Sequence, residues 1–194
     1  MTNTSIDTVT DTDTRRAIAV MVLAFGADPL MRWIYPDPYA YLTGFPDFIR
    51  KFTGKGFDHK TAYHLHDFAG VTLWRPPGVE PEKKEIVSLL QRAVPRDLQN
   101  DLFNLFGQTG RYRPNKPYWH LSFIGIDPNR QHRGLGSRLI EHTLLTCDHD
   151  KKPAYLNASN PWLIPFYQRH GFQLLDTIQA GSSPPIFPML RKPH

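Results

Sequence analysis

The sequence predicts a mixed α/β fold in which one central sheet is flanked by helices. Strand patterns alternate with helix patterns along most of the chain, and two of the strand pairs read as hairpins. The chain has 194 residues, of which 40% are hydrophobic and 21% are charged, as in a globular protein with one core. No internal repeat or linker divides it. We expect a single domain over residues 12–194, preceded by a disordered Thr- and Asp-rich segment, residues 1–11.

The first half of the chain is predicted to contain helices and one hairpin. Apolar residues at helical spacing indicate the helices, and Asp67 to Gly70 indicates the tight turn of the hairpin. Prolines are expected to break the stretch from Asp28 to Phe48 into short helical turns and loops. The aromatic residues of that stretch either line a substrate pocket or pack over the sheet edge: Trp33, Tyr35, Tyr39, Tyr41 and Phe45. The expected elements are a helix over 13–25, strands over 61–66 and 71–75, and helices over 86–93 and 97–106.

The second half alternates between strands and helices. Strands are expected over 118–126, 154–157, 172–178 and 186–190. One helix is expected from a glycine-rich turn to about residue 146, and another over 161–170. The apolar stripe of the first of these helices includes Leu139, Leu144 and Cys147, so we expect a buried thiol.

Composition excludes several functional classes. The formal net charge is +5 and the pI is about 9.4, which suits an acidic ligand, but no basic stripe interleaved with aromatics indicates nucleic-acid binding. The apolar run after Arg15-Arg16 is too short to span a membrane, and the aspartates before it do not suit an export signal. The single cysteine excludes an internal disulfide and fits a reducing cytoplasm. We therefore expect a cytoplasmic protein with no nucleic-acid partner and no membrane partner.

The most informative motif is the turn from Gln131 to Gly136, which follows an apolar strand and opens an amphipathic helix. Gly134 and Gly136 allow a ligand to approach the backbone closely. The first helical N–H groups have no intrahelical partner, and the helix dipole makes this end positive. A phosphate or pyrophosphate is the natural ligand. Taken alone, the pattern also fits an ordinary strand-to-helix turn, because it lacks the Lys-Ser/Thr of a P-loop and the third glycine of a dinucleotide site.

With the residues downstream, the chain resembles the GNAT superfamily of acyl-CoA-dependent N-acetyltransferases. The family's Gln/Arg-x-x-Gly-x-Gly/Ala motif matches Gln131, Gly134 and Gly136. Its Asn…Tyr pair and its Gly-Phe ending match Asn160, Tyr167, Gly171 and Phe172. The resemblance covers about Trp119 to Phe172. The run from Leu156 to Phe172 and the basic end Met189 to Pro193 are most similar to the puromycin N-acetyltransferase-like group.

The resemblance implies a GNAT-type acyl-CoA N-acyltransferase fold and acetyl transfer from acetyl-CoA, the cosubstrate, to a primary amine of a small molecule by direct attack on the thioester. It implies that the strand before the glycine turn binds pantetheine through its backbone, and that Tyr167 reprotonates the CoA sulfur. A tyrosine of the core is the alternative for Tyr167, and a plain helix N-cap is the alternative for Asn160. The residues assigned to acetyl-CoA are Ile124, Gly125, Ile126, Gln131, His132, Arg133, Gly134, Leu135, Gly136, Ser137, Asn160 and Tyr167.

His120 is the candidate base that would deprotonate the amine. It alternates with Ser122 and Ile124 on one strand face, at an offset from Gln131 where many family members have a Glu or His base. A neutral imidazole can accept a proton near pH 7. A half-buried structural histidine is an equally good interpretation. Gly125 in a strand interior indicates a bulge or a close backbone approach, with a packing glycine as the alternative.

Two other functions remain open from the sequence: a non-catalytic acyl-CoA-binding regulatory module and a basic nucleic-acid-binding protein. His64 and His66 share a strand face but lack a third ligand at a recognisable spacing, so no metal site is predicted. The pattern does not define the acceptor amine, the acyl chain length or the oligomeric state, and a homodimer is left open.

Overall fold

The computed structural model describes residues 5–54 and 56–194. The strands are β1 (Ile6–Thr8), β2 (Ala62–Leu65), β3 (Gly70–Arg75), β4 (Trp119–Ile126), β5 (Ala154–Ala158), β6 (Gln173–Leu174) and β7 (Phe187–Arg191). The α-helices are α1 (Thr14–Ala24), α2 (Pro29–Ile34), α3 (Pro38–Phe52), α4 (Lys83–Ala93), α5 (Gln99–Thr109), α6 (Leu135–His149) and α7 (Ile164–Arg169). The short 3₁₀ turns are η1 (His66–Phe68), η2 (Arg96–Leu98), η3 (Gly110–Tyr112), η4 (Pro128–Arg130) and η5 (Pro161–Leu163).

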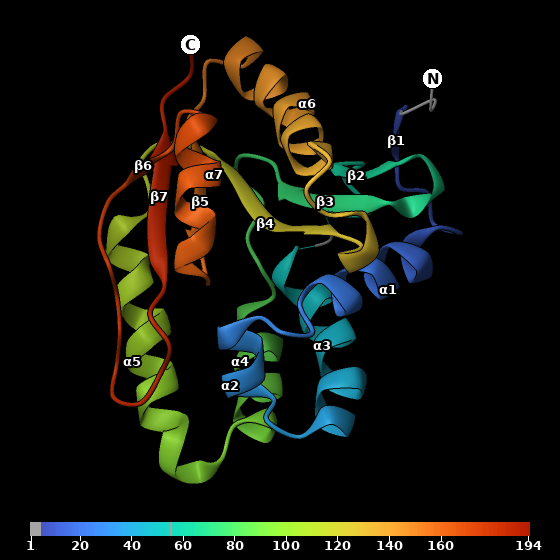
Figure 1. Cartoon of the computed structure of the whole chain (residues 1–194). Coiled ribbons are helices and arrows are strands. Elements are labelled where there is room, and N and C mark those ends of the chain that lie inside the picture. The colour runs from blue at the N-terminus through green and yellow to red at the C-terminus, as the bar shows by residue number, and fades with distance from the viewer. Residues whose placement is uncertain (1–4, 55) are drawn as a thin grey trace.

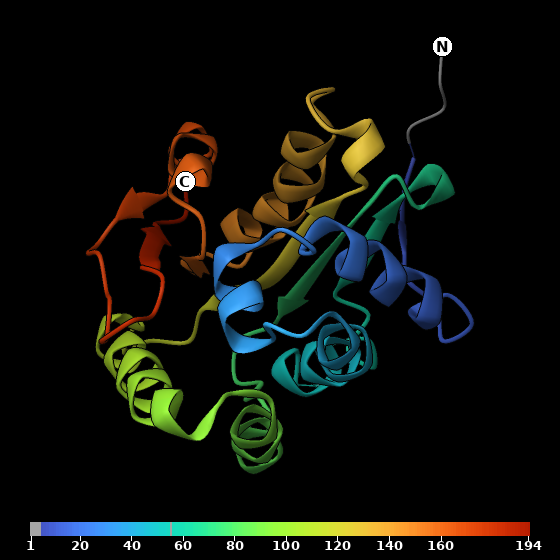
Figure 2. The same ribbon diagram turned by 60° about the horizontal axis from the view of Figure 1, so that its bottom comes forward.

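The mixed α/β fold is confirmed. Within the described residues, seven strands form one sheet in the order β1-β2-β3-β4-β5-β7-β6. Neighbouring strands are antiparallel except for β4 and β5, which run parallel. Helix α6 packs on one side of β3 and β4, and α1 packs on the other, with α3 against α1 (Figure 1). Figure 2 shows α1 and α6 on opposite sides of these strands from a second direction.

Aromatic packing on the α1 side fixes the position of β4. The ring of Phe123 contacts those of Phe25, Phe45, Phe48 and Phe52, with centroid separations from 5.5 to 6.2 Å. Tilted and edge-on aromatic pairs each add about 0.5–1.5 kcal/mol beyond the area that they bury. These contacts tie α3 and the end of α1 to the middle of β4.

Strand β4 has a bulge in its pairing with β3 and separates from β5 on its other edge. Leu73 pairs with Phe123 but Trp74 pairs with Leu121, so Ser122 is the extra residue of the bulge. On its other edge, β4 pairs with β5 only at Trp119 and His120, although the strands continue to Ile126 and Ala158. The two strands therefore diverge beyond these two positions (Figure 1).

The predicted disorder of residues 1–11 is wrong for the part of this segment that the structure describes. Residues 6–8 form β1, which pairs antiparallel with β2, and Val9 is 3% exposed. Residues 1–4 lie outside the described residues. A polar, Thr-rich segment forms an edge strand here because β2 offers it an unpaired backbone edge and the core accepts Val9.

The stretch from residue 28 to residue 48 is also more regular than predicted. Pro29 and Pro38 occupy the first turns of α2 and α3, where the missing N–H has no cost. Asp28 and Asp37 cap these helices by accepting from the N–H groups of Met31 and Ala40, each three residues on, at 2.9 and 2.8 Å. The repeated Asp-Pro pairs are thus helix starts, and α3 continues through Pro46.

In the last part of the chain, the expected strand over 172–178 shortens to β6. Beyond it, Ile178 makes a single bridge to Ile186. The helix expected over 161–170 is divided into η5 and α7. Cys147 is buried as expected, and burial raises the pKa of its thiol to about 12, so it is unreactive at neutral pH. Among the helices of the described residues, none has the length and apolarity needed to cross a membrane.

Gly125 is a close-approach glycine, not the bulge. A Cβ at this position would lie 2.7 Å from the Cβ of Ala24 and 3.0 Å from the sulfur of Met21, both on α1. The bulge lies three residues earlier, at Ser122. The absent side chain lets α1 pack directly on β4.

We predict that Gly125→Ala lowers the free energy of unfolding by about 1–3 kcal/mol, the usual cost of overpacking a core. Urea unfolding monitored by circular dichroism measures it. Gly107→Ala on α5 is the matched control, because a Cβ there meets nothing within 4 Å. The control should be neutral or stabilising by up to about 1 kcal/mol. Equal unfolding midpoints for the two variants would contradict the close approach.

Candidate functional site

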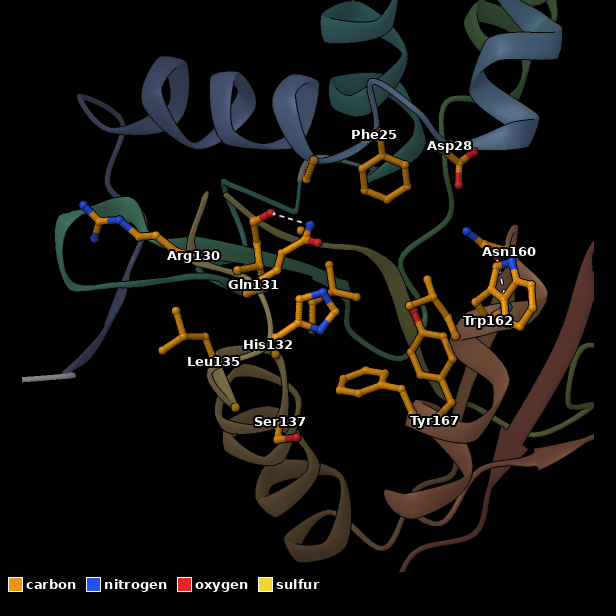
Figure 3. Close-up of a pocket in the computed structure, with 18 of the residues that line it drawn as sticks. Phe25, Asp28, Arg130, Gln131, His132, Leu135, Ser137, Asn160, Trp162 and Tyr167 are labelled. Carbon is orange, nitrogen blue, oxygen red and sulfur yellow. Dashed lines mark hydrogen bonds between the residues drawn. The ribbon is translucent and has the colours of Figure 1, made fainter. Parts of the chain in front are cut away.

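A groove of about 570 Å³ lies at the C-terminal end of β4. Its walls come from the end of α1, the glycine turn with the start of α6, and the segment from η5 to α7 (Figure 3). The sequence assigned twelve residues to the acyl donor, and all of them except Arg133 line this groove. Arg133 is exposed and is not among the residues that line the groove, and its role in ligand binding stays a prediction.

The glycine turn has the backbone geometry of an anion site. Gly134 is the N-cap of α6 and adopts a left-handed conformation with φ of +74°. No side chain caps this helix end, and its first turn holds no acidic residue. The amide of Gln131 donates to the carbonyl of Ile126 at 3.3 Å, which ties the turn to the end of β4. The free N–H groups and the positive helix end therefore face the groove without an internal competitor.

Two arginines that the sequence interpretation missed also line the groove. Arg130 precedes the glycine turn and Arg169 ends α7, and both are exposed. Arg169 reaches the groove only through the tertiary fold, because α7 lies far from the glycine turn in sequence. Arg130 is adjacent to the motif and could have been found from sequence. Guanidinium groups at these positions suit phosphate groups of a bound ligand.

Asn160 has the geometry of a helix N-cap. Its side chain accepts from the N–H of Trp162 at 3.1 Å, so it is the N-cap of η5. It also lines the groove, close to the exposed ring of Trp162 (Figure 3). The cap holds the loop between β5 and α7 in position, and a role in ligand binding stays a prediction.

Tyr167 lies at the junction of two cavities. Its side chain is only 5% exposed and packs against the rings of Phe166 and Phe172. Burial, together with the nearby carboxyl of Asp28, raises its pKa above the ordinary tyrosine value. The phenol therefore keeps its proton at neutral pH and can donate it, which fits both a core tyrosine and a proton donor.

The second cavity, of about 90 Å³, lies between β4, β5 and helices α3 and α5. It shares Phe25, Ile124, Leu163 and Tyr167 with the groove. Two ligands that bound in the groove and in this cavity would meet at that shared wall. The cavity is mainly apolar, and its polar lining residues are Thr109, Arg113, Ser122, Asn157 and Ser159.

The aromatic residues between Asp28 and Phe48 that were candidates for pocket lining do not line either cavity. Tyr35, Tyr41 and Phe45 are buried, and the hydroxyl of Tyr41 donates to the carbonyl of Val22 at 2.6 Å. The packing interpretation is thus the correct one for these three. The aromatic lining comes instead from Phe48, Phe52, Phe106 and Phe123.

Asp28 is the main site residue that the sequence interpretation missed. It lines the groove beside Tyr167 and caps α2, where one oxygen accepts from the N–H of Met31 at 2.9 Å. Its other oxygen accepts from the hydroxyl of Ser159, which lines the second cavity. Burial raises the pKa of this carboxyl, and the two hydrogen bonds partly oppose the shift. From sequence, Asp28 could have been identified only as a helix cap.

His120 does not reach the groove. It is 3% exposed, lies against the rings of Phe52 and Tyr155, and lines neither cavity. Its Nδ1 is 3.1 Å from the hydroxyl of Ser122, which does line the second cavity. Burial and the charges of Arg75 and Arg113 hold the pKa of the imidazole well below 6.5, so it is neutral at pH 7. The structure thus separates His120 from Tyr167, and favours the structural interpretation of this histidine.

His64 and His66 do not share a strand face. The ring of His64 stacks on Phe68 at 4.0 Å, whereas His66 begins η1 after β2 has ended. Within the residues that the structure describes, no three His, Cys, Asp or Glu side chains are grouped so as to hold a metal ion.

Residues 103–174 match the family model described as Acetyltransferase (GNAT) domain. This segment, 72 of the 194 residues, is similar to GNAT acetyltransferase domains. The matched segment runs from α5 to β6 and contains β4, the glycine turn, η5 and α7, which form most of the groove. A curated relative, the 5-NmdU N-acetyltransferase of Pseudomonas phage PaMx11, is 31% identical over 77 residues. That match covers 40% of this chain and 55% of the phage protein, so the chain spans about half the length of this relative.

Solved structures share the whole fold. A histone acetyltransferase HPA2 and related acetyltransferase from Corynebacterium glutamicum is similar with a TM-score of 0.72 at 22% identity, covering 98% of this chain and 97% of that chain. Arylalkylamine N-acetyltransferase 2 from Aedes aegypti has a TM-score of 0.73 at 14% identity, covering 99% and 100%. Polyamine N-acetyltransferase from Drosophila melanogaster has a TM-score of 0.71 at 13% identity, covering 98% and 100%. At these identities the likeness establishes the GNAT fold.

We predict that Gly136→Asp weakens the binding of coenzyme A by at least about tenfold, because a carboxylate at the start of α6 repels phosphate. Isothermal titration calorimetry measures the affinity. Gly136→Asn is the matched control, since it adds the same volume next to the Phe166 ring, 3.4 Å from the new Cβ, without the charge. Equal affinities for the Asp and Asn variants would show that phosphate does not bind at this helix end.

Proposed function

We propose that this protein is an acetyl-CoA-dependent N-acetyltransferase that acts on a primary amine of a small molecule. One observation carries the proposal: a groove lined by the glycine turn and a separate, mostly apolar cavity meet at a wall that contains Tyr167. Direct transfer needs the thioester and the amine side by side, and this wall is where the two cavities allow it. The phage relative is an N-acetyltransferase, which supports the reaction class.

The groove provides what the acyl donor needs. The N–H groups at the start of α6 and the guanidinium groups of Arg130 and Arg169 suit the phosphates of CoA. Beyond His120, β4 no longer pairs with β5, so its edge from Leu121 to Ile126 can hydrogen-bond the pantetheine amides and the thioester oxygen. A donor bound in this way places its thioester near Ile124 and Tyr167.

We infer that Asp28 is the base, in place of His120. An amine reaches the site as an ammonium ion, and the Asp28 carboxylate takes one of its protons. The nitrogen then attacks the thioester carbonyl carbon, a C–N bond forms and the C–S bond breaks. Tyr167 donates its proton to the departing sulfur, and the phenolate regains the proton that the nitrogen loses as the amide forms. Asp28 returns its proton to solvent, so the products are the amide and CoA thiol.

The likeness of residues 156–172 to the puromycin N-acetyltransferase-like group is a sequence-level hypothesis about the acceptor. The single buried Cys147 supports a reducing, cytoplasmic setting. If the protein were instead a non-catalytic CoA-binding module, it would bind acetyl-CoA without transferring the acetyl group to any amine. The following variants distinguish this alternative from an acetyltransferase.

We predict that Tyr167→Phe lowers kcat by about 10²–10⁴-fold while the affinity for acetyl-CoA changes little, because only the proton donor is lost. Steady-state kinetics with a thiol-release assay measure kcat. Tyr41→Phe is the control, since Tyr41 is 4% exposed and lines neither cavity. Loss of thermal stability in Tyr167→Phe with unchanged kcat would instead establish a core tyrosine.

We predict that Asp28→Asn lowers kcat by about 10²–10⁴-fold, since an amide cannot accept the proton. Asp37→Asn is the matched control, because both aspartates cap a helix that begins with proline and asparagine caps equally well. In the wild type, the rate falls as the pH drops through the raised pKa of Asp28, because the protonated carboxyl is not a base. Wild-type kcat in Asp28→Asn would place the base elsewhere.

A further inference from the structure

A cluster of two arginines and a neutral histidine lies beside the second cavity, away from the groove. It consists of Arg75 at the end of β3, Arg113 after η3, and His120, which pairs with Arg75 across the sheet. Arg75 is 3% exposed, and its Nε and Nη1 are buried without a hydrogen-bond partner among the described residues. The Nε of Arg113 is likewise buried and unpartnered within those ranges.

No acid among the described residues forms a salt bridge with either arginine. Burial, together with the charge of Arg113, lowers the pKa of the Arg75 guanidinium to about 10, and Tyr118 and Glu80 oppose this shift only in part. The Arg75 guanidinium lies over the Phe52 ring at 5.5 Å, which compensates part of the burial. Unpaired buried guanidinium groups are costly, so a cluster of this kind indicates a missing anionic partner.

The cluster reaches the second cavity through Arg113 and Ser122, which both line it. Arg75 and His120 lie behind them, and the charges of Arg75 and Arg113 both act on His120. At the other end of the same space, Asp28 accepts from Ser159, which also lines the cavity. The cavity is therefore polarised, with a carboxylate near Tyr167 and cationic groups at the far end.

The rise of β4 sets a length scale for this space. Ser122 lies about 7 Å and His120 about 13 Å from Ile124 along β4, at the rise of an extended strand. An extended carbon chain advances about 1.2 Å per bond, so about six bonds span the shorter distance. The cavity volume of about 90 Å³ is below the ~150 Å³ of a cavity that holds a benzene ring. Its natural occupant is a slender chain.

We propose that the acceptor is a slender amine whose far end carries a carboxylate or phosphate group bound by Arg113, with Arg75 behind it. The ammonium group faces Asp28 and Tyr167, and the chain between the charges lies along the apolar wall. This inference rests on the proposed function, because it names the acceptor class of the same site.

The first test compares matched acceptors with the wild-type protein and acetyl-CoA. The carboxylate arm is γ-aminobutyrate, δ-aminovalerate and ε-aminocaproate, the phosphate-like arm is aminobutylphosphonate, and the neutral arm contains the amides of the three acids. We expect kcat/KM for ε-aminocaproate to exceed that of its amide by about ten- to hundredfold, the range for a charge-assisted hydrogen bond. The anionic arm with the higher kcat/KM shows whether the site prefers a carboxylate or a phosphate-like group. Equal or higher kcat/KM for the neutral amides overturns the inference.

The second test uses variants of the same loop. Arg113→Gln should abolish the preference for the anionic acceptors, so that kcat/KM for ε-aminocaproate and for its amide become equal within about a factor of two. Arg113→Lys keeps the positive charge and should retain part of the preference for anionic acceptors. This variant separates the effect of charge from that of packing if the Gln variant is unstable. Arg111→Gln is the matched control, because Arg111 is exposed and lines neither cavity.

The third test separates this inference from the proposed function. Calorimetric titration of the CoA-saturated protein with ε-aminocaproate and with its amide measures binding without turnover. Tighter binding of the acid supports the anion subsite even if no amine is acetylated, in which case the transferase proposal fails alone. Acetylation of neutral amines without tighter binding or faster turnover of either anionic arm overturns the subsite and leaves the transferase proposal intact.

Discussion

The divergence of β4 from β5 after His120 is the constraint on which the rest of the site depends. Two parallel strands pair at only two positions and then separate. The second cavity lies between them and meets the groove at Ile124 of β4. The bulge at Ser122 and the aromatic packing around Phe123 hold β4 on the side of α1 and α3. A β4 that stayed paired with β5 would close the shared wall at Ile124 and Tyr167. The two central strands therefore lack backbone hydrogen bonds to each other here, and the unpaired edge of β4 can hydrogen-bond a ligand.

Charge is distributed unevenly along this space, and each region has a separate structural origin. The start of α6 is positive because glycine caps it and no acid lies in its first turn. Asp28 is held by a helix cap and by Ser159, which fixes a carboxyl beside a buried tyrosine. Arg75 and Arg113 are brought together by the ends of β3 and η3. Unsatisfied polar groups of this kind are rare in native cores and are expected at ligand sites.

Burial decides which titratable groups can act in proton transfer. His120 has the residue type expected of a base, but burial and two neighbouring arginines make it a poor proton acceptor that is remote from the groove. Asp28 has the opposite combination, because its partial burial raises the pKa of a carboxyl that remains on the groove wall. Tyr167 keeps its proton for the same reason, and its position on both cavities is what distinguishes it from the other buried tyrosines.

The sequence by itself determined the class of fold, the order of most elements, and the local chemistry of the glycine turn. These depend on short-range periodicity and on backbone conformations that only certain residues adopt, such as Gly134 at φ of +74°. Only the tertiary structure decided which residues share a cavity. Asp28 and Tyr167 are far apart in sequence, and so are Arg75 and Arg113, and no local pattern reports such pairs. The same limit explains the errors: β1 needed the edge of β2, Gly125 needed the approach of α1, and the fate of His120 depended on rings and charges from other elements.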